Sequence, residues 1–298
     1  MSEFIHKLFG RHPEPEPGPE APPAQEASQP TGEEFVPPHL EPPQILVGVG
    51  HSVGRLREHN EDSLFTLTTN LVIDAQTIPF GVYIVADGMG GHLHGERASG
   101  VAVRVMAGYL IENLYLPLFG HPAGQPDRDL QDILRLGVEK AHQAILAQAP
   151  GGGTTLTTVV VWNEQVSIVH VGDSRAYAVD HQGGIAPLTR DHSLVSRLVE
   201  MGQISSDEAA AHPQRNVLYR ALGQGEPVDA EYSSLPLSQA SHLLLCSDGL
   251  WGTISEADLS RLIGSSNLPA EVCQKLVEAA NLAGGPDNIS VILVRLPD

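Results

Sequence analysis

Residues 85–99 of the chain read VADGMGGHLHGERAS, and this stretch carries the strongest signal of how the protein folds. An apolar run stops at Asp87, passes through three glycines and continues as a sequence typical of a helix. A carboxylate at the end of a buried strand is costly unless a partner compensates for its lost hydration. That partner could be a bound cation, a helix N-terminus or an arginine, and the rest of the sequence decides between them.

Five apolar segments of the chain each carry an acidic residue at one end. The acidic positions are Asp87, Asp173, Asp248, Asp287 and the adjacent pair Glu61 and Asp62. Any one of them could be a turn former, because aspartate and glycine are common in turns. As a group they would repel one another at one edge of the sheets unless cations neutralised them. The pattern therefore predicts bound cations.

The kind of cation follows from the ligands. Carboxylates without clustered Cys or His offer only oxygen, which selects hard ions such as Mg²⁺ or Mn²⁺. Several carboxylates can hold two such ions about 3.5 to 4 Å apart, an arrangement used in the hydrolysis of phosphate esters. We expect Asp87 to bridge the two ions and Gly88 to let its own carbonyl approach them.

A cationic group for the substrate is expected in the segment GRLREHNEDS, residues 54–63. Arg55 and Arg57 lie there beside the acidic pair, and arginine binds phosphate through its planar guanidinium. The alternative for either arginine is a surface ion pair with Glu58 or Glu61.

The apolar periodicity predicts an α+β fold. Strands are expected over residues 45–53, 63–67, 80–87, 155–162, 165–173, 175–180, 242–248 and 288–296. Helices are expected over residues 92–115, 129–148, 255–263 and 269–282, with short helical pieces between residues 193 and 222. Helix pairs are separated from groups of strands, which favours layers built on antiparallel sheets.

Two segments permit a more specific expectation. The strand over residues 80–87 is apolar on both faces, so we expect it inside a sheet. The run GGGTT at residues 151–155 resembles a phosphate-binding loop, but such a loop needs a lysine and a following helix. We expect a tight turn that packs against the sheet.

The N-terminal part differs in composition from the rest. Residues 11–45 hold 11 of the 23 prolines and many glutamates, so they are predicted to form a disordered linker. In residues 1–10, four apolar side chains fall at helical spacing: Phe4, Ile5, Leu8 and Phe9. They indicate either a docking or membrane-contact helix or a frayed terminus. Residues 46–298 are predicted to form the folded domain.

The composition excludes several classes of protein. A net charge of −19 at pH 7 argues against binding of nucleic acid, which needs a basic surface. Cys246 and Cys273 lack metal-type spacing and are expected to be buried reduced thiols. No apolar run approaches the roughly 20 residues of a transmembrane helix, and the N-terminus lacks the apolar core of a signal peptide. We expect a cytoplasmic protein without a membrane span, and a monomer.

Eight segments together resemble the metal-dependent Ser/Thr protein phosphatases of type 2C, the PPM family, in their bacterial form. In order, they are GRLREHNEDS, VADGMGGHLHGERAS, GGGTTLTTVVV, VGDSRAYAV, LTRDHSLVSRLVEMGQI, HPQRNVLYRALG, LLLCSDGLWG and GGPDNISVILV. A lone DGMGG is a weak signal, whereas eight segments in order across residues 46–296 are specific. The resemblance implies a four-layer α/β/β/α sandwich of two antiparallel sheets flanked by helix pairs.

The resemblance also implies roles for the acidic residues. Asp87 and the carbonyl of Gly88 match the ligands of the first ion, with Asp87 bridging to the second. Asp248 and Asp287 match the ligands of the second ion. Glu61 and Asp62 match the acidic pair that holds metal-bound waters. Asp173 matches the ligand of a third, weaker ion, which it shares with Asp248. The implied cofactor is a pair of Mn²⁺ or Mg²⁺ ions.

Three further features follow from the resemblance. Arg57 matches the phosphate-binding arginine because it stands three residues before NED. Arg55 stands two residues earlier and does not match that position. Asn288 follows the last acidic residue and is expected to orient it. The segment from about 190 to 225 matches a mobile flap that influences the choice of substrate.

The implied mechanism is direct attack of a metal-bridging water on phosphorus, without a covalent enzyme intermediate. Nothing in the sequence matches a Cys-x5-Arg nucleophile motif. Eukaryotic members have a histidine after DG as the proposed general acid, and this chain has Met89 there. His92 could replace that histidine, directly or through water; the alternative is that it packs in the first turn of the helix.

We therefore expect a phosphatase for phosphoserine and phosphothreonine in proteins that opposes bacterial Ser/Thr kinases. One rival is a binding module with the same fold, but such a pseudophosphatase would lack ligands, and none is missing. A second rival is a regulator that acts on the antagonist of an anti-sigma factor, and the sequence leaves it open. The N-terminal segment and linker could tether the domain to a partner such as a kinase.

Overall fold

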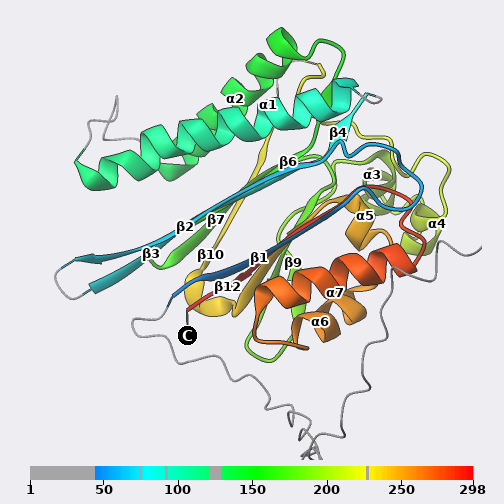
Figure 1. Ribbon diagram of the computed structural model, residues 1–298. Coiled ribbons are helices and arrows are strands. Elements are labelled where there is room, and N and C mark those ends of the chain that lie inside the picture. The colour runs from blue at the N-terminus through cyan, green and yellow to red at the C-terminus, as the bar shows by residue number, and fades with distance from the viewer. Residues whose placement is uncertain (1–43, 74–75, 91–92, 121–128, 226–227, 298) are drawn as a thin grey trace, which may run out of the picture. The chain divides into compact units, whose positions relative to one another are not determined.

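The computed structural model describes residues 44–73, 76–90, 93–120, 129–225 and 228–297 (Figure 1). The chain divides between Val36 and Pro37, and every described residue lies in the second unit. The predicted segment 1–10, and all but the last two residues of the predicted linker 11–45, lie outside the described residues. The domain boundaries remain predictions.

Two five-stranded antiparallel sheets form the centre of the second unit (Figure 1). The first sheet has the order β1–β12–β11–β8–β9, with the bounds Leu46–Ser52, Ile289–Arg295, His242–Cys246, Arg175–Val179 and Ile185–Pro187. The second sheet has the order β10–β7–β6–β3–β2, with the bounds Glu231–Pro236, Gln165–Val171, Leu156–Trp162, Gln76–Ala86 and Ser63–Ile73. A separate short pair joins β4 (Gly88–Met89) to β5 (Gly153–Thr154).

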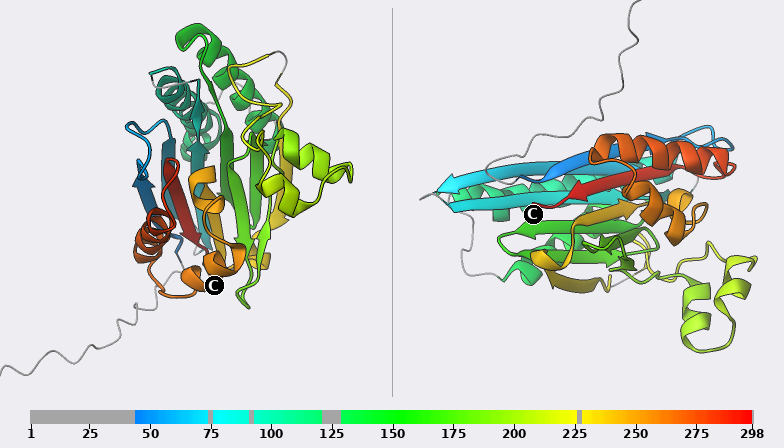
Figure 2. Two further views of the ribbon diagram at one scale, coloured as in Figure 1. Left: turned by 90° about the vertical axis from the view of Figure 1, so that its right-hand side faces the viewer. Right: turned by 90° about the horizontal axis from the view of Figure 1, so that it is seen from below.

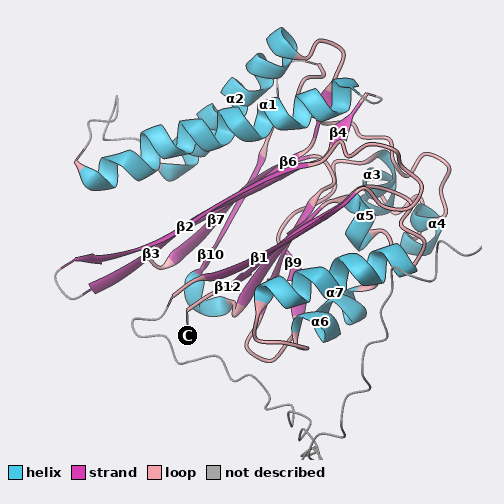
Figure 3. Ribbon diagram, in the orientation of Figure 1, coloured by secondary structure: helices cyan, strands magenta, loops and turns pink. Residues whose placement is uncertain are grey.

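Helices cover the outer faces of both sheets (Figures 2 and 3). On the second sheet lie α1 (Leu93–Leu110) and α2 (Leu130–Gln148). On the first sheet lie α5 (Asp248–Trp251), α6 (Glu256–Ile263) and α7 (Pro269–Leu282). The predicted flap holds α3 (Leu194–Glu200) and α4 (Ser206–Ala210). The expected four-layer α/β/β/α sandwich is confirmed.

The middle of β3 is buried on both faces because it separates two cores. The side chains that face α1 and α2 are Phe80, Val82, Ile84 and Ala86. The side chains that face the first sheet are Tyr83 and Val85. Successive side chains of a strand point to opposite faces, so an uninterrupted apolar run suits a strand with a core on each side. The expected position inside a sheet is confirmed, since β3 lies between β6 and β2.

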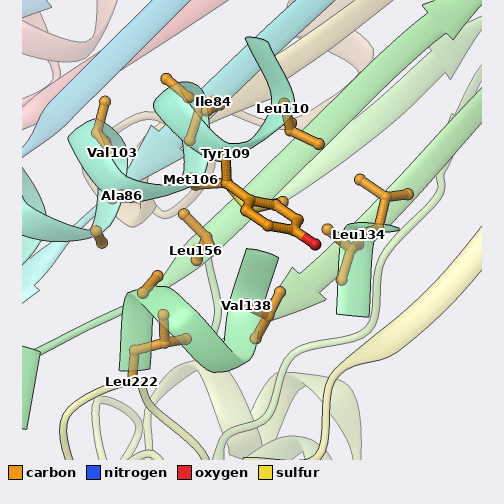
Figure 4. Packing of buried hydrophobic residues seen from close by; sticks show 14 of the residues in the cluster. Ile84, Ala86, Val103, Met106, Tyr109, Leu110, Leu134, Val138, Leu156 and Leu222 are labelled. Carbon is orange, nitrogen blue, oxygen red and sulfur yellow. The ribbon is translucent and has the colours of Figure 1, made fainter. Parts of the chain in front are cut away.

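The core beneath the helix pair is built from aliphatic and aromatic side chains of different sizes. Figure 4 shows Met106 and Leu110 of α1 near Ile84 of β3, with Leu134 and Val138 of α2 beside them. By length and composition alone, the helical segment 94–119 could cross a membrane. In this fold it packs as a core helix.

The expected strands and helices are present, with differences at their ends. The strands β2 and β3 are longer than predicted, with 11 residues each, and they pair as a hairpin. The helix expected over residues 92–115 is α-helical only to Leu110 and continues as a π-helical turn and a 3₁₀ turn. The strands β9 and β10 were not predicted, because each lies at a sheet edge and neither contains a buried residue.

Two smaller predictions are confirmed. In the GGGTT segment, Gly151 lies in a turn and Gly153–Thr154 form β5, and no helix follows. Pairing of β5 with β4, and so with the DGM sequence after β3, was not predicted. Cys246 and Cys273 are buried free thiols.

Candidate functional site

The acidic residues at the strand ends converge. Asp87 follows β3 and Asp173 follows β7, both in the second sheet, while Asp248 follows β11 of the first sheet. Asp62 precedes β2 and Asp287 precedes β12. Burial, and then the charges of the other four groups, raise the pKa of Asp87 well above its ordinary value. Repulsion from all four carboxylates shows that they lie around Asp87, as expected.

The environment of these carboxylates disfavours their charge. Burial raises the pKa of Asp62 to about 6 and that of Asp248 to about 7, and Asp287 adds to both effects. Burial, followed by the charge of Asp248, raises the pKa of Asp173. Asp62 and Asp173 are buried, whereas Asp87 and Asp248 keep a partly exposed edge. An ion could reach that edge from solvent.

The unsatisfied oxygens at this site fit a hard cation. One carboxylate oxygen of Asp62 and one of Asp248, the Oδ1 atom in each, are buried without a hydrogen-bond partner. The other oxygen of Asp62 accepts a bond of 2.8 Å from the hydroxyl of Ser247. Carboxylate and carbonyl oxygens are the ligands that Mg²⁺ and Mn²⁺ prefer. The donor set therefore fits the expected cofactor.

The described side chains do not form a complete ligand shell by themselves. Within the described ranges, no group of three His, Cys, Asp or Glu side chains has the spacing to hold an ion. Magnesium-type ions keep several waters and need few protein ligands. Ions at this site would depend on water and on backbone oxygen for part of their coordination.

The backbone of Asp87 is held by the last residue of β5 and by the residue that follows it. Its amide donates to the hydroxyl of Thr155 (2.8 Å), and its carbonyl accepts from the hydroxyl of Thr154 (2.8 Å) and the amide of Thr155 (2.9 Å). A Cβ atom on Gly88 would collide with the backbone of Gly95 and Glu61. Glycine is therefore required here because its backbone packs directly against that of Gly95 and Glu61. The expected approach of the Gly88 carbonyl to an ion stays a prediction.

Asn288 acts differently from the expectation. Its side chain accepts from the amide of Glu61 (2.8 Å) and donates to the carbonyls of Val53 and His59 (2.9 Å each). The group that orients Asp287 is the backbone amide of Asn288, at 2.8 Å from Oδ1. The side chain thus holds the loop between β1 and β2, while the backbone orients the carboxylate.

Arg57 is paired with a predicted metal ligand. Its guanidinium lies 2.6 Å from Oδ2 of Asp287, and the Arg57 side chain is 51% exposed. The hydrogen bond to Asp287 raises the pKa of Arg57. The alternative expected from the sequence was an ion pair with Glu58 or Glu61, whereas the ion pair in the structure is with Asp287.

Other expected positions are less informative. His92 lies outside the described residues, so its expected role stays a prediction. Met89 is described, lies half-buried in β4 and pairs with Gly153.

A group of residues that contacts the backbone of Asp173 was not predicted from the sequence. Arg175 makes two bonds to Asp191, of 2.9 and 2.7 Å, and lies 3.6 Å above the ring of Trp251. The indole of Trp251 donates to the carbonyl of Asp173 at 2.9 Å. The DSR and DGLWG sequences contain Arg175 and Trp251, but spacing alone does not show that they stack.

Carboxylates that gather at one edge of the sheets, with oxygen as the only donor, are the residue types that hold hard cations in enzymes that hydrolyse phosphate esters. The sequence model described as protein phosphatase 2C matches residues 50–279. The chain belongs to the protein phosphatase 2C family.

Individual relatives agree with this assignment. The serine/threonine phosphatase stp of Listeria monocytogenes is 36% identical over 248 residues, which cover 81% of this chain and 92% of the relative. The protein phosphatase PhpP of Streptococcus pneumoniae is 35% identical over 223 residues, 72% of this chain and 85% of the relative.

Solved structures share the fold. The serine/threonine phosphatase PstP/Ppp of Mycobacterium tuberculosis has a TM-score of 0.70 at 30% identity, over 86% of this chain and 100% of that chain. The catalytic domain of PstP in complex with two manganese ions has a TM-score of 0.68 at 29% identity, over 86% and 99%. That structure holds two ions, the number expected here.

Proposed function

We propose that the chain is a metal-dependent phosphatase that hydrolyses phosphoserine and phosphothreonine in proteins. The observation that carries the proposal is the convergence of acidic side chains from both sheets on Asp87, with two buried oxygens left unsatisfied. Asp87, the carbonyl of Gly88, Asp248 and Asp287 would bind two Mn²⁺ or Mg²⁺ ions, and Glu61 and Asp62 would hold their waters. Bound ions of this kind activate water and neutralise phosphoryl charge.

Arg57 is the group of the chain that we assign to the phosphoryl oxygens. Its side chain is half exposed and already lies at the edge of the carboxylate cluster, 2.6 Å from Asp287. A planar guanidinium can bind two phosphoryl oxygens at once. In this role Arg57 orients the substrate and stabilises charge that develops in the transition state.

The state of the cysteines supports direct attack by water. Burial raises the pKa of both Cys246 and Cys273 to about 12, so neither is a thiolate at neutral pH. Water supplies the oxygen that bonds to phosphorus, and the bond from phosphorus to the serine or threonine oxygen breaks. The leaving oxygen needs a proton, and His92 is our candidate donor.

Finer features belong to the same proposal. A third, weaker ion between Asp173 and Asp248 is supported by the charge of Asp248, which raises the pKa of Asp173 after burial. We also propose that the chain opposes Ser/Thr kinases, that it works in the cytoplasm as a monomer, and that its N-terminal part tethers it to a partner. An acidic chain of net charge −19 agrees with the absence of nucleic acid among its partners.

The test is an assay of purified protein with a phosphothreonine peptide and with p-nitrophenyl phosphate. Each substrate is measured in EDTA, Mg²⁺ and Mn²⁺, for the wild type and for Asp87→Ala and Asp248→Ala. We expect Mn²⁺ to restore activity lost in EDTA and both variants to lose at least about 1,000-fold in kcat.

The matched control is Asp132→Ala, which removes an exposed carboxylate of α2 that makes only a 3.7 Å contact with Arg135. Its activity should equal that of the wild type. Wild-type protein without activity in any metal would contradict the proposal and favour a binding module.

A further inference from the structure

The predicted flap, residues 190–225, is hydrogen-bonded at both ends next to a predicted metal ligand. Near its end, Leu222 pairs with Thr154 through backbone bonds of 2.9 and 3.1 Å. The hydroxyl of Thr154 in turn donates to the carbonyl of Asp87. Near its start, His192 contacts Gly172, the residue before Asp173. Movement at either end of the flap would therefore act on a loop that carries an acidic ligand.

His192 binds both backbone polar groups of Gly172. The amide of His192 donates to the carbonyl of Gly172 at 2.7 Å, and the amide of Gly172 donates to Nδ1 of His192 at 3.1 Å. Gly172 has a φ of 112° and lies just beyond the end of β7, so its amide needs a partner outside the ladder. His192 is 2% exposed, which keeps water from replacing that partner.

His170 of β7 joins the same contact. Its Nε2 lies 3.0 Å from the carbonyl oxygen of Gly172 and 3.1 Å from that of Arg190, so Nε2 carries the proton and donates. Its Nδ1 then accepts from the hydroxyl of Thr157 at 2.9 Å. Burial lowers the pKa of His170 to about 4 and that of His192 to about 3. Both rings are therefore neutral at pH 7 and keep one acceptor nitrogen.

Buried hydroxyls extend this network from His170 to Asp87. The one proton of the Thr157 hydroxyl is shared between Nδ1 of His170 and the carbonyl of Ser174, which lies 3.1 Å away. The Ser174 hydroxyl lies 2.7 Å from that of Thr155. The Thr155 hydroxyl accepts from the amide of Asp87 at 2.8 Å. The start of the flap, the Asp173 loop and the Asp87 backbone thus share one hydrogen-bonded network.

We propose that His192 is a positioning residue that sets the place of the Asp173 loop and of the start of the flap together, through its two bonds to Gly172. It acts by holding the backbone next to Asp173. The inference rests on the proposed function for its consequence in catalysis. The bond itself can be measured without activity.

The experiment compares His192→Leu, which fills the space without an acceptor, with His192→Asn, which keeps an acceptor near the position of Nδ1. Amide hydrogen exchange at Gly172 is measured in EDTA, and kcat/KM for a phosphothreonine peptide is measured in Mn²⁺. We expect His192→Leu to speed exchange at Gly172 and to lower kcat/KM, each by about tenfold, because a buried donor loses its partner. His192→Asn should recover most of both losses.

The matched control is His142→Leu. His142 is also 2% exposed, and its Nδ1 accepts from the amide of Gly223 at 3.1 Å, near the other end of the flap. This variant should speed exchange at Gly223 and leave Gly172 unchanged.

Three results would overturn the inference: unchanged exchange at Gly172 in His192→Leu, equal losses in His192→Leu and His192→Asn, or faster exchange at Gly172 in His142→Leu. A wild type inactive in every metal would instead refute the proposed function, while the exchange data would still decide whether His192 holds Gly172.

Discussion

At the scale of single residues, Asp62 carries a charge that destabilises the metal-free protein. Burial, the largest cause, raises its pKa from 3.8 to about 6. For an acid with a raised pKa in the folded state, the free energy of unfolding is highest below the unfolded pKa and falls as pH rises through the folded pKa. We expect Asp62→Asn in EDTA to unfold with a free energy larger by about 1–3 kcal/mol at pH 8, with almost no gain at pH 4.

Urea unfolding at the two pH values measures this difference. The control is Asp132→Asn, whose carboxylate is exposed and should change stability by less than about 0.5 kcal/mol at either pH. An equal gain at pH 4 and pH 8 would show that the effect of Asp62→Asn is not the removal of a buried charge.

The position of Arg57 gives a second prediction at this scale. Arg57→Ala should lower kcat/KM for a phosphopeptide by about 100-fold, because a charged donor to the phosphoryl oxygens is lost. Arg57→Lys should recover only part of the lost kcat/KM, since lysine keeps the positive charge but lacks the planar guanidinium. Stability should change by less than about 0.5 kcal/mol, because the ion pair with Asp287 is largely exposed.

Steady-state kinetics of the neighbouring variant Arg55→Ala is the control, and its kcat/KM should stay near that of the wild type. If Arg55→Ala loses activity and Arg57→Ala does not, the phosphate-binding arginine has been assigned to the wrong position.

At the scale of elements, two of the three glycines of α1, Gly95 and Gly108, have opposite expected behaviour. Gly108 is exposed, and a Cβ atom there would meet nothing within 4 Å. Gly95 lies in the first turn, where a Cβ atom would overlap the carboxylate of Glu61. Gly108→Ala should raise the free energy of unfolding by about 0.5–1 kcal/mol with unchanged activity. Gly95→Ala should displace Glu61 and lower kcat by about tenfold or more.

Thermal unfolding and steady-state kinetics of the two variants test this directly, because each replaces the same residue type in the same helix. Full activity in Gly95→Ala would show that the close approach of α1 to Glu61 is not needed for catalysis.

At the scale of the whole molecule, pH should act on stability in opposite directions with and without metal. Asp248 has a raised pKa of about 7, so its protonated form stabilises the folded state, and this stabilisation is lost as pH rises through 7. The lowered pKa values of His170 and His192 have the opposite effect on the free energy of unfolding. The stabilisation from their neutral forms is complete above pH 6.5 and is lost as pH falls toward 4 for His170 and 3 for His192. Between pH 6.5 and 7.5 the carboxylates make the larger change in the free energy of unfolding.

In EDTA we therefore expect the free energy of unfolding to fall by about 1 kcal/mol between pH 6.5 and 7.5. Saturating Mn²⁺ should remove this fall, because an ion that binds ionised carboxylates holds them in that form and stabilises the folded state. Below pH 6.5 the loaded protein should lose stability as the histidines of the unfolded chain take up protons. Melting curves at both pH values, with and without Mn²⁺, test this; equal pH slopes in EDTA and Mn²⁺ would contradict it.

Much of the fold was predictable because its signals are local. An apolar run such as residues 80–86 reports a strand buried on both faces, and an acid followed by glycine at the end of a strand reports where that strand meets a site. The edge strand β10 was missed, since its sequence EYSSLP has neither burial nor alternation to reveal it. The early end of α1 was missed because apolar spacing continues past the point where the hydrogen bonds change.

By itself the sequence determined the order of the main strands and helices, and which acidic residues stand at strand ends, because periodicity and strand ends depend on neighbours a few residues away. Only the tertiary structure decided the partners: Arg57 with Asp287, the side chain of Asn288 with the loop before β2, and His192 with Gly172. These contacts join residues 20 to 230 positions apart. Packing of the two sheets brings them within hydrogen-bond distance, and no local pattern records that packing.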